Sequence, residues 1–423
     1  MNVLIFNFIL YFGYFLYSFR KNHYLTVHNA ISLWFSIVAL MGVVSVHTKV
    51  YQAVFGNIHI DDITPYVYCF LSFLFLVYPL RKLNFKNVVI ENINKVDVQQ
   101  FRKISYAPSL ILLVYIIALI PDVILCLSMS DISDVYNEQR GEGVDLFNHS
   151  GFVEKIFWIG RKCYNWFWAI FAFYSIYLIN NNRIKDKKYY IFLFMVSVVP
   201  YFLRTISSGG RGGFIFFPIQ IALVLLPLWS YLTNKTKMSI IKYALIAVGL
   251  FSIYIVSMTI ARVSDSQSET PFTSIVRYFG EPYPNLGNNL YGHVKHYLMG
   301  RRMFPELFGF DNSGKTQYEL FSIWYSYCGV ATLNYKTIFG DFYIEFGTAI
   351  SLLIIFSIGF IMNLYLKKGK LYFHQIPLYA YYMTLCSTAP LWFNQRNTGD
   401  LFVVLQLIIV SYIIKRFLYI KEL

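Results

Sequence analysis

Charged residues are scarce in this chain of 423 residues, because Asp, Glu, Lys and Arg together make up only 14% of it. Soluble domains carry about a quarter charged residues. The low charged fraction, combined with 57% hydrophobic residues, therefore excludes an ordinary soluble domain. Apolar runs of about twenty residues recur along the chain, and a run of that length crosses a bilayer as a helix. The composition predicts an all-α, polytopic integral membrane protein.

Sequence patterns for metals and nucleotides are also missing. The five cysteines form no CxxC pair, and no group of His and Cys has metal-ligand spacing. We therefore expect no metal and no cofactor, and we expect the cysteines to be small residues buried in the membrane. No nucleotide-binding fingerprint occurs, which argues against a nucleotide-linked substrate. The N-terminal run lacks a basic leader and a small-residue cleavage site, so we expect a span there and no secretory signal peptide.

The apolar runs predict about eleven transmembrane helices. They lie at about 2–19, 30–46, 65–80, 106–128, 157–180, 189–206, 214–232, 239–260, 342–366, 372–391 and 400–414. The loops on one side then carry 21 basic and 4 acidic residues, and those on the other side carry 15 and 18. Basic loops mark the cytoplasm, so we expect a periplasmic N-terminus and a cytoplasmic C-terminus. The net charge of +14 then follows from topology, and no nucleic-acid partner is needed.

Two long loops fall on the predicted periplasmic side of a single transmembrane domain, residues 1–423. The smaller loop, residues 130–155, is acidic, and the larger, residues 261–341, has about eighty residues. Loops of this length without a structural reason usually carry a function. We therefore expect the functional site on the periplasmic face.

The stretch RTISSGGRGGFIFFPIQ, residues 204–220, places four glycines and two arginines between two apolar runs. Such a backbone does not lie exposed to lipid inside the membrane. Glycine lets backbone N–H groups approach a ligand, the N-terminus of the next helix attracts anions, and arginine binds phosphate oxygens. We therefore predict that Arg204, Gly210, Arg211 and Gly212 bind a diphosphate. The alternative is an interfacial hairpin whose arginine contacts lipid phosphate.

The large loop adds further cations, among them Arg262 and Arg277, and a pair of histidines. If the run EPYPNLGNNLYGHVKHYLMGRR is helical, His293 and His296 share a face. Histidine is easily poised as a general base near neutral pH, so His293 is a candidate base. The alternatives are His296 and the carboxylates of the loop: Asp265, Glu269, Glu281, Glu306, Asp311 and Glu319.

The whole layout resembles the O-antigen polymerases (the Wzy family, oligosaccharide repeat unit polymerases). The most specific match is SSGGRGGFI, residues 207–215, which is similar to the Ser-Arg-Gly-Gly signature between two spans of that family. The family's essential periplasmic arginines map best onto Arg211, then Arg262 and Arg277. The related ligases use a histidine of the large periplasmic loop, for which His293 is the candidate.

This resemblance implies a glycosyltransferase of lipopolysaccharide biosynthesis in the bacterial inner (plasma) membrane. It would join undecaprenyl-diphosphate-linked oligosaccharide repeat units on the periplasmic face, with inversion at the anomeric carbon. The implied fold is like that of the C-type lipid-linked glycosyltransferases and the O-antigen ligases. A chain-length regulator and a flippase are the implied partners, besides membrane lipid.

Two alternative functions remain open at this point. An O-antigen ligase, which transfers polysaccharide to lipid A core, shares most of these features. A lipid-linked oligosaccharide flippase, a transporter, usually has short loops and charges inside a central cavity. Charges within the predicted spans are few and the largest loop is long, which favours an enzyme over a transporter.

Overall fold

The computed structural model describes residues 1–23, 26–83, 89–91, 93–128, 151–181, 186–207, 212–263, 270–309, 317–332, 335–366, 370–392 and 398–418. Within these ranges, the side chains of residues 89, 91, 261–263, 306, 317–318 and 398–402 are not described. The chain divides into two compact units. The first comprises residues 1–87, 267–369 and 384–401, and the second comprises residues 88–266, 370–383 and 402–423.

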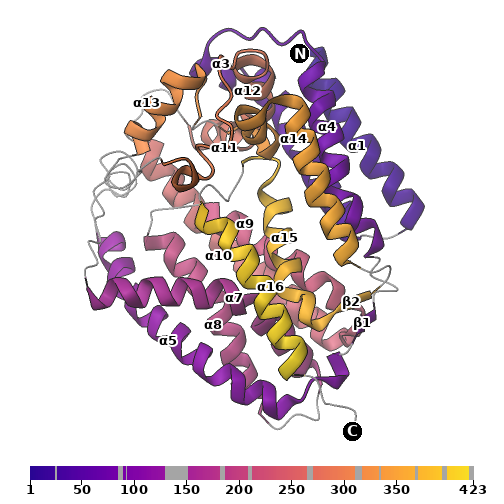
Figure 1. Cartoon of the computed structure of the whole chain (residues 1–423), viewed down its shortest axis with the longest axis vertical. Helices are drawn as coiled ribbons and strands as arrows, with labels where there is room; N and C mark the ends of the chain where they lie inside the picture. Colours follow the sequence, from indigo (N-terminus) through magenta and orange to yellow (C-terminus); the bar gives the residue numbers. More distant parts are fainter. Residues whose placement is uncertain are drawn as a thin grey trace. The chain divides into compact units, whose positions relative to one another are not determined.

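The first unit is a helical bundle built around an aromatic core. Its elements are α1 (Asn2–Asn22), α2 (Val27–His47), α3 (Val50–Phe55), α4 (Thr64–Val77), η1 (Tyr78–Lys82), α11 (Pro271–Gly280), α12 (Pro282–Asn285), η5 (Leu286–Leu290), η6 (Pro305–Phe308), α13 (Gln317–Cys328) and α14 (Thr337–Tyr365). Helix α2 packs on α1 and α11, and α14 lies beside α4 (Figure 1).

Aromatic rings join the helices of this unit. The ring of Tyr11 on α1 lies 5.7 Å from that of Phe35 on α2, 5.0 Å from that of Phe73 on α4 and 5.6 Å from that of Tyr283 on α12. All four residues are fully buried. Buried aromatic side chains contribute large apolar areas, so this cluster fixes the short helix α12 against the long helices.

The second unit consists mainly of long helices. Its elements are β1 (Val89–Glu91), η2 (Ile93–Lys95), α5 (Val98–Ser128), α7 (Phe152–Asn180), α8 (Lys187–Ser207), α9 (Gly212–Leu225), η4 (Leu226–Tyr231), α10 (Asn234–Val263), β2 (Lys370–Tyr372), η7 (Phe373–Gln375), and parts of α15 (Ile376–Thr388) and α16 (Thr398–Phe417). Helices α5, α7 and α8 pack against one another (Figure 1). The two short strands pair in parallel, a small exception to the predicted all-helical structure.

Seven helices are long and apolar enough to cross a membrane. They are α1, α2, α5, α8, α9 with η4, α10 and α14. The prediction of a mainly helical, multi-pass membrane protein is therefore confirmed. The other four predicted spans coincide with the helical segments α4 with η1, α7, α15 and α16. The count of eleven and the orientation in the membrane stay predictions.

The surface of α10 agrees with a lipid environment. Only 11% of its most apolar window is buried, and large side chains such as Leu245, Leu250 and Ile253 are more than 60% exposed. In water such a face would be a contiguous apolar patch of the kind that drives association. The five cysteines are all buried, as predicted.

The large loop predicted at residues 261–341 is a folded part of the first unit over most of its length. It contains α11, α12, η5, η6 and α13, and it continues directly into α14. Most of the smaller predicted loop, residues 130–155, lies outside the described residues.

Candidate functional site

The run EPYPNLGNNLYGHVKHYLMGRR is helical only as far as Leu290. His293 and His296 therefore do not share a helix face, and the arrangement expected for a helical run is not formed. The helix ends here because Gly292 adopts a φ of 79°, a conformation that commonly terminates helices. Residues 291–303, which we call the turn segment, continue as a series of turns.

A break in α14 holds the turn segment. Gly347 has φ 71° and ψ −178°, a combination that is essentially restricted to glycine. A helix that ends leaves its last carbonyl groups available to other donors. Here the N–H of Leu298 donates to the carbonyl of Ile344 (3.1 Å), and the N–H of Met299 donates to that of Glu345 (2.6 Å). The break in the helix thus fixes the turn segment to α14.

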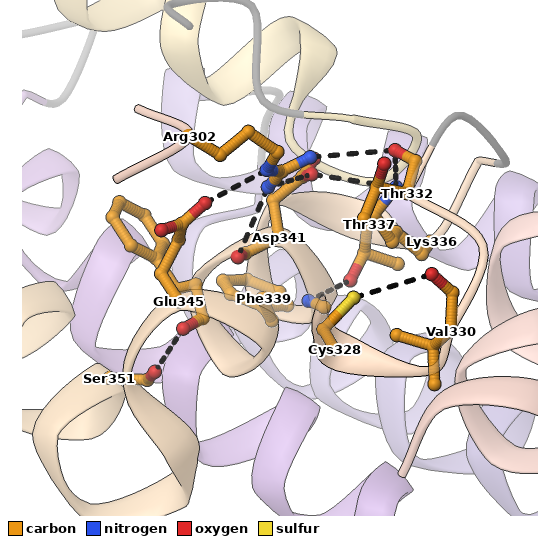
Figure 2. A network of polar contacts seen from close by, with 12 residues as sticks. Arg302, Cys328, Val330, Thr332, Lys336, Thr337, Phe339, Asp341, Glu345 and Ser351 are labelled. Carbon is orange, nitrogen blue, oxygen red and sulfur yellow. Dashed lines mark hydrogen bonds and ion pairs between the residues drawn. The ribbon is translucent and has the colours of Figure 1, made fainter. Parts of the chain in front are cut away.

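A buried ionic network continues from this contact (Figure 2). Arg302 donates from Nε to Oε1 of Glu345 and from Nη2 to Oδ1 of Asp341, both at 2.8 Å. Lys336 Nζ lies 3.6 Å from Asp341 Oδ1 and donates to the carbonyl of Thr332 at 2.6 Å. The side chains of Asp341 and Glu345 are 1% and 0% exposed. Two cations and two carboxylates therefore balance each other inside the protein.

Arg302 is committed to this network. Burial opposes its charge, but the carboxylates of Asp341 and Glu345 raise the pKa of the guanidinium above its ordinary value. The other oxygen of Glu345, Oε2, accepts from the N–H of Gly300 at 3.0 Å. Removing one partner from such a buried pair strands the other as an uncompensated charge. Arg302 therefore anchors the turn segment and leaves no unpaired charge for a ligand.

The preceding residue, Arg301, has different surroundings. Its guanidinium donates to the hydroxyl of Tyr327 on α13 and lies 5.2 Å from the centre of that ring. The ring of His296 is 5.8 Å from the same tyrosine ring. The backbone N–H of Lys295 donates to the carbonyl of Cys328 at 2.9 Å.

Arg301 and His296, which contact Tyr327, together with Tyr327 itself and Lys295, whose backbone is held next to α13, form what we call the cation–aromatic cluster. Lys295, His296 and Tyr327 are exposed, and Arg301 is half-buried. Within the part of the chain that the structure describes, no carboxylate pairs with its three basic side chains. Unpaired cations beside an exposed aromatic ring suit an anionic group linked to an apolar or sugar ring. The sequence lists the basic residues but does not indicate which of them lack a carboxylate.

The residues predicted to bind a diphosphate are described only in part. Gly210 and Arg211 lie outside the described residues. Gly212 is the first residue of α9, and Arg204 is exposed in the last turn of α8. Arg204 lies close enough to Arg161 on α7 for the two charges to repel each other.

The remaining predicted residues are not members of the cation–aromatic cluster. Arg262 belongs to α10, and its side chain is not among those described. Arg277 is half-buried on α11, one turn before Glu281. His293 is exposed and makes no contact with Tyr327 of the kind that His296 makes.

Glu281, one of the carboxylates named from the sequence, is the most unusual acidic group of this region. It lies between α11 and α12 and is 6% exposed. Its Oε1 accepts from Nδ2 of Asn285 (2.9 Å) and from the N–H of Tyr335 (3.1 Å). Burial raises the pKa of Glu281 to about 7, against the opposing influence of Arg277, Lys336 and the two hydrogen bonds. A carboxyl group with this pKa exchanges a proton readily at neutral pH.

A polar network connects Glu281 to the π-helix η5. The Oδ1 atom of Asn285 accepts from the hydroxyl of Tyr51 (3.0 Å) and from Nδ2 of Asn289 (2.7 Å). π-Helices are rare and occur frequently at functional sites. The hydrogen bonds of Asn285 therefore connect the side chain of Glu281 to the π-helix.

Comparison with protein-family models, with curated proteins and with solved structures found no match for this chain. The fold itself shows the class of the protein, which is a multi-pass helical membrane protein. An ionic network is buried at the break in α14. Arg301 of the cation–aromatic cluster is the residue before Arg302 of that network.

Proposed function

We propose that this protein is an O-antigen polymerase. It joins undecaprenyl-diphosphate-linked oligosaccharide repeat units on the periplasmic face of the bacterial inner membrane by inverting, metal-independent glycosyl transfer. The observation that carries the proposal is the cation–aromatic cluster, whose basic side chains have no carboxylate partner among the described residues. The cluster belongs to a chain with seven helices that are long and apolar enough to cross a membrane. Its basic residues lie on the turn segment, which the buried ionic network of Arg302 anchors.

The chemistry of the cluster suits a lipid diphosphate that leaves in the reaction. Arg301 presents a planar fork of N–H groups, and Lys295 adds a second positive charge. Fixed cations offset the negative charge that develops on a departing diphosphate. Tyr327, which is 39% exposed, offers an aromatic ring to the sugar. The diphosphate-binding and catalytic roles predicted from the sequence for Arg204, Arg211, Arg262 and Arg277 stay predictions.

The position of the histidines changes their ranking. His293 is the preferred candidate from the sequence, but His296 is the histidine whose ring approaches Tyr327. We therefore assign His296 to the binding of the substrate and leave His293 as the weaker candidate.

A lipopolysaccharide gel after deletion of the gene tests the proposal. We expect the deletion strain to carry a single repeat unit on the core, because flipping and ligation continue while chain growth stops. Wild-type protein should restore long chains, and Arg301→Ala should not. Arg20→Ala, a change of a basic residue in the last turn of α1, is the matched control and should restore them. A deletion strain with bare core would overturn the polymerase assignment.

A flippase is the second candidate, and one specific observation favours it. Asp341 and Glu345 are buried charges within α14, a helix long and apolar enough to span the membrane and broken at Gly347. Buried ionisable groups and interrupted helices are features of transporters. The small number of charges within the predicted spans therefore argues less strongly against a transporter. Bare core with accumulated single lipid-linked units would identify a flippase, whereas bare core with long lipid-linked chains would identify a ligase.

A further inference from the structure

We infer that Glu281 accepts the proton of the attacking sugar hydroxyl in this transfer reaction. The inference rests on the proposed function and names the base, which the sequence leaves open between two histidines and several carboxylates.

Glu281 differs from the two other described carboxylates of its surroundings. Asp341 and Glu345 are both ion-paired with Arg302, so their charges are satisfied in the folded protein. Glu281 has no ion-pair partner within the described residues, although it is almost as deeply buried. A buried carboxylate without an ion-pair partner gains by taking up a proton.

The two oxygens of Glu281 have separate roles. Oε1 is held by Asn285 and by the backbone of Tyr335, and Oε2 has no hydrogen-bond partner among the described residues. A general base must come within hydrogen-bond reach of the proton that it accepts, and Oε2 is the oxygen available for that contact.

The charged and titratable groups that act on Glu281 come from three elements. They are Arg277 on α11, Lys336 just before α14 and the hydroxyl of Tyr51 on α3. Burial outweighs the two cations, so the pKa of Glu281 rises to about 7 and the ionised form dominates only above that pH.

The proton transfer to Glu281 is part of the substitution at the anomeric carbon. The hydroxyl proton of the acceptor sugar moves to Oε2 of Glu281 while the hydroxyl oxygen bonds to the anomeric carbon of the donor. The bond from that carbon to the diphosphate oxygen breaks, and its electron pair leaves with the lipid diphosphate. Glu281 then releases its proton to water, and the site is ready for another transfer.

The test uses full-length protein in liposomes and lipid-linked repeat units extracted from cells that lack this gene. The initial rate of polymer formation is measured between pH 5.5 and 9. Because the ionised carboxylate is the active form, the wild-type rate should rise about tenfold per pH unit below pH 7 and level off above it. An acidic pH optimum would overturn the inference without the need for any variant.

Two variants separate a catalytic role from a structural one. Glu281→Gln keeps an oxygen to accept from Asn285 and Tyr335 but takes up no proton, so we expect a loss of about 100-fold or more. Glu281→Asp should retain part of the rate and the rise with pH. Glu154→Gln, a change of an exposed residue in the first turn of α7, is the control and should leave the rate unchanged.

The outcomes distinguish this inference from the function on which it rests. If Glu281→Gln polymerises within a few-fold of wild type and with the same pH profile, Glu281 is not the base and the polymerase assignment stands. If the wild-type protein forms no polymer from these units at any pH, the function itself is wrong.

Discussion

Arg301 and Arg302 are neighbours in the sequence with opposite surroundings. Arg302 forms hydrogen-bonded ion pairs with two buried carboxylates. The guanidinium of Arg301 contacts the ring and hydroxyl of Tyr327 and has no carboxylate partner within the described residues. One arginine therefore stabilises the turn segment, and the other is available to bind an anion. Whether a basic residue of a loop stabilises the fold or binds a ligand therefore depends on its partners, more than on its presence in the loop.

The largest effect is expected from Arg302→Ala. The change leaves Asp341 and Glu345 buried without the arginine with which both form ion pairs. Breaking a buried pair in this way costs about 3–5 kcal/mol. We expect the variant to accumulate poorly in the membrane and to melt at a lower temperature in detergent. Arg301→Ala is the paired control and should accumulate normally. Equal stability of the two variants would remove the distinction between anchor and binding group.

Gly347→Ala should have the next largest effect, because it attacks the break that holds the turn segment. A Cβ atom there would lie 3.0 Å from Cζ of Tyr297, and the φ of 71° disfavours any other residue. Strain of this kind costs about 1–3 kcal/mol. The midpoint of thermal unfolding in detergent measures it. Gly13→Ala on α1, where an added Cβ meets nothing within 4 Å, should be neutral or stabilising. Equal melting of both variants would show that the break tolerates a side chain.

Arg301→Ala should reduce function without reducing stability. The variant loses a charged hydrogen-bond donor that we assign to the diphosphate, a loss equivalent to about 10- to 100-fold in binding. The rate of polymerisation at limiting substrate measures the effect, and the melting temperature serves as the control. Arg301→Lys should lie between alanine and wild type because it keeps the charge and loses the planar fork. Wild-type rates for Arg301→Ala would exclude the cation–aromatic cluster from the site.

The smallest effect is expected from the histidines. His296→Ala removes a ring next to Tyr327. A contact of this kind within the protein is worth about 0.5–1.5 kcal/mol, so we expect the rate to fall by no more than about tenfold. His293→Ala should change the rate by less, since His293 has no such contact. Chain-length distributions on a gel compare the two variants directly. A larger effect of His293→Ala would restore the ranking that follows from the sequence.

Much of the fold could be predicted because apolar runs are a local property. The positions of α1, α5 and α10 follow from hydropathy, since a helix satisfies its own backbone groups in lipid, but α5 begins at Val98 and α10 at Asn234, before the predicted spans. The burial of the cysteines followed in the same way. The folded character of residues 261–341 could not be predicted in this way, because Tyr283 is buried against the ring of Tyr11 on α1, which lies far from it in the sequence.

The candidate site was predicted less well than the fold. Arg277, Glu281, His293 and His296 were all recognised as residue types that could carry the chemistry. Their roles depended on neighbours that the chain brings from a distance: Glu345 lies 43 residues from Arg302, and Tyr335 lies 54 residues from Glu281. The helical face expected for the histidines failed at Gly292, whose positive φ ends the helix.

The sequence by itself determined that this protein is helical, multi-pass and embedded in a membrane, because hydrophobic length and residue composition act without long-range contacts. Only the tertiary structure decided which charges are neutralised and which are not. Burial and the distance to an opposite charge set the energy of each ionised group, and both arise when α14 breaks at Gly347 and the turn segment docks on it. That docking buries Arg302 between two carboxylates and leaves Arg301 against the ring of Tyr327.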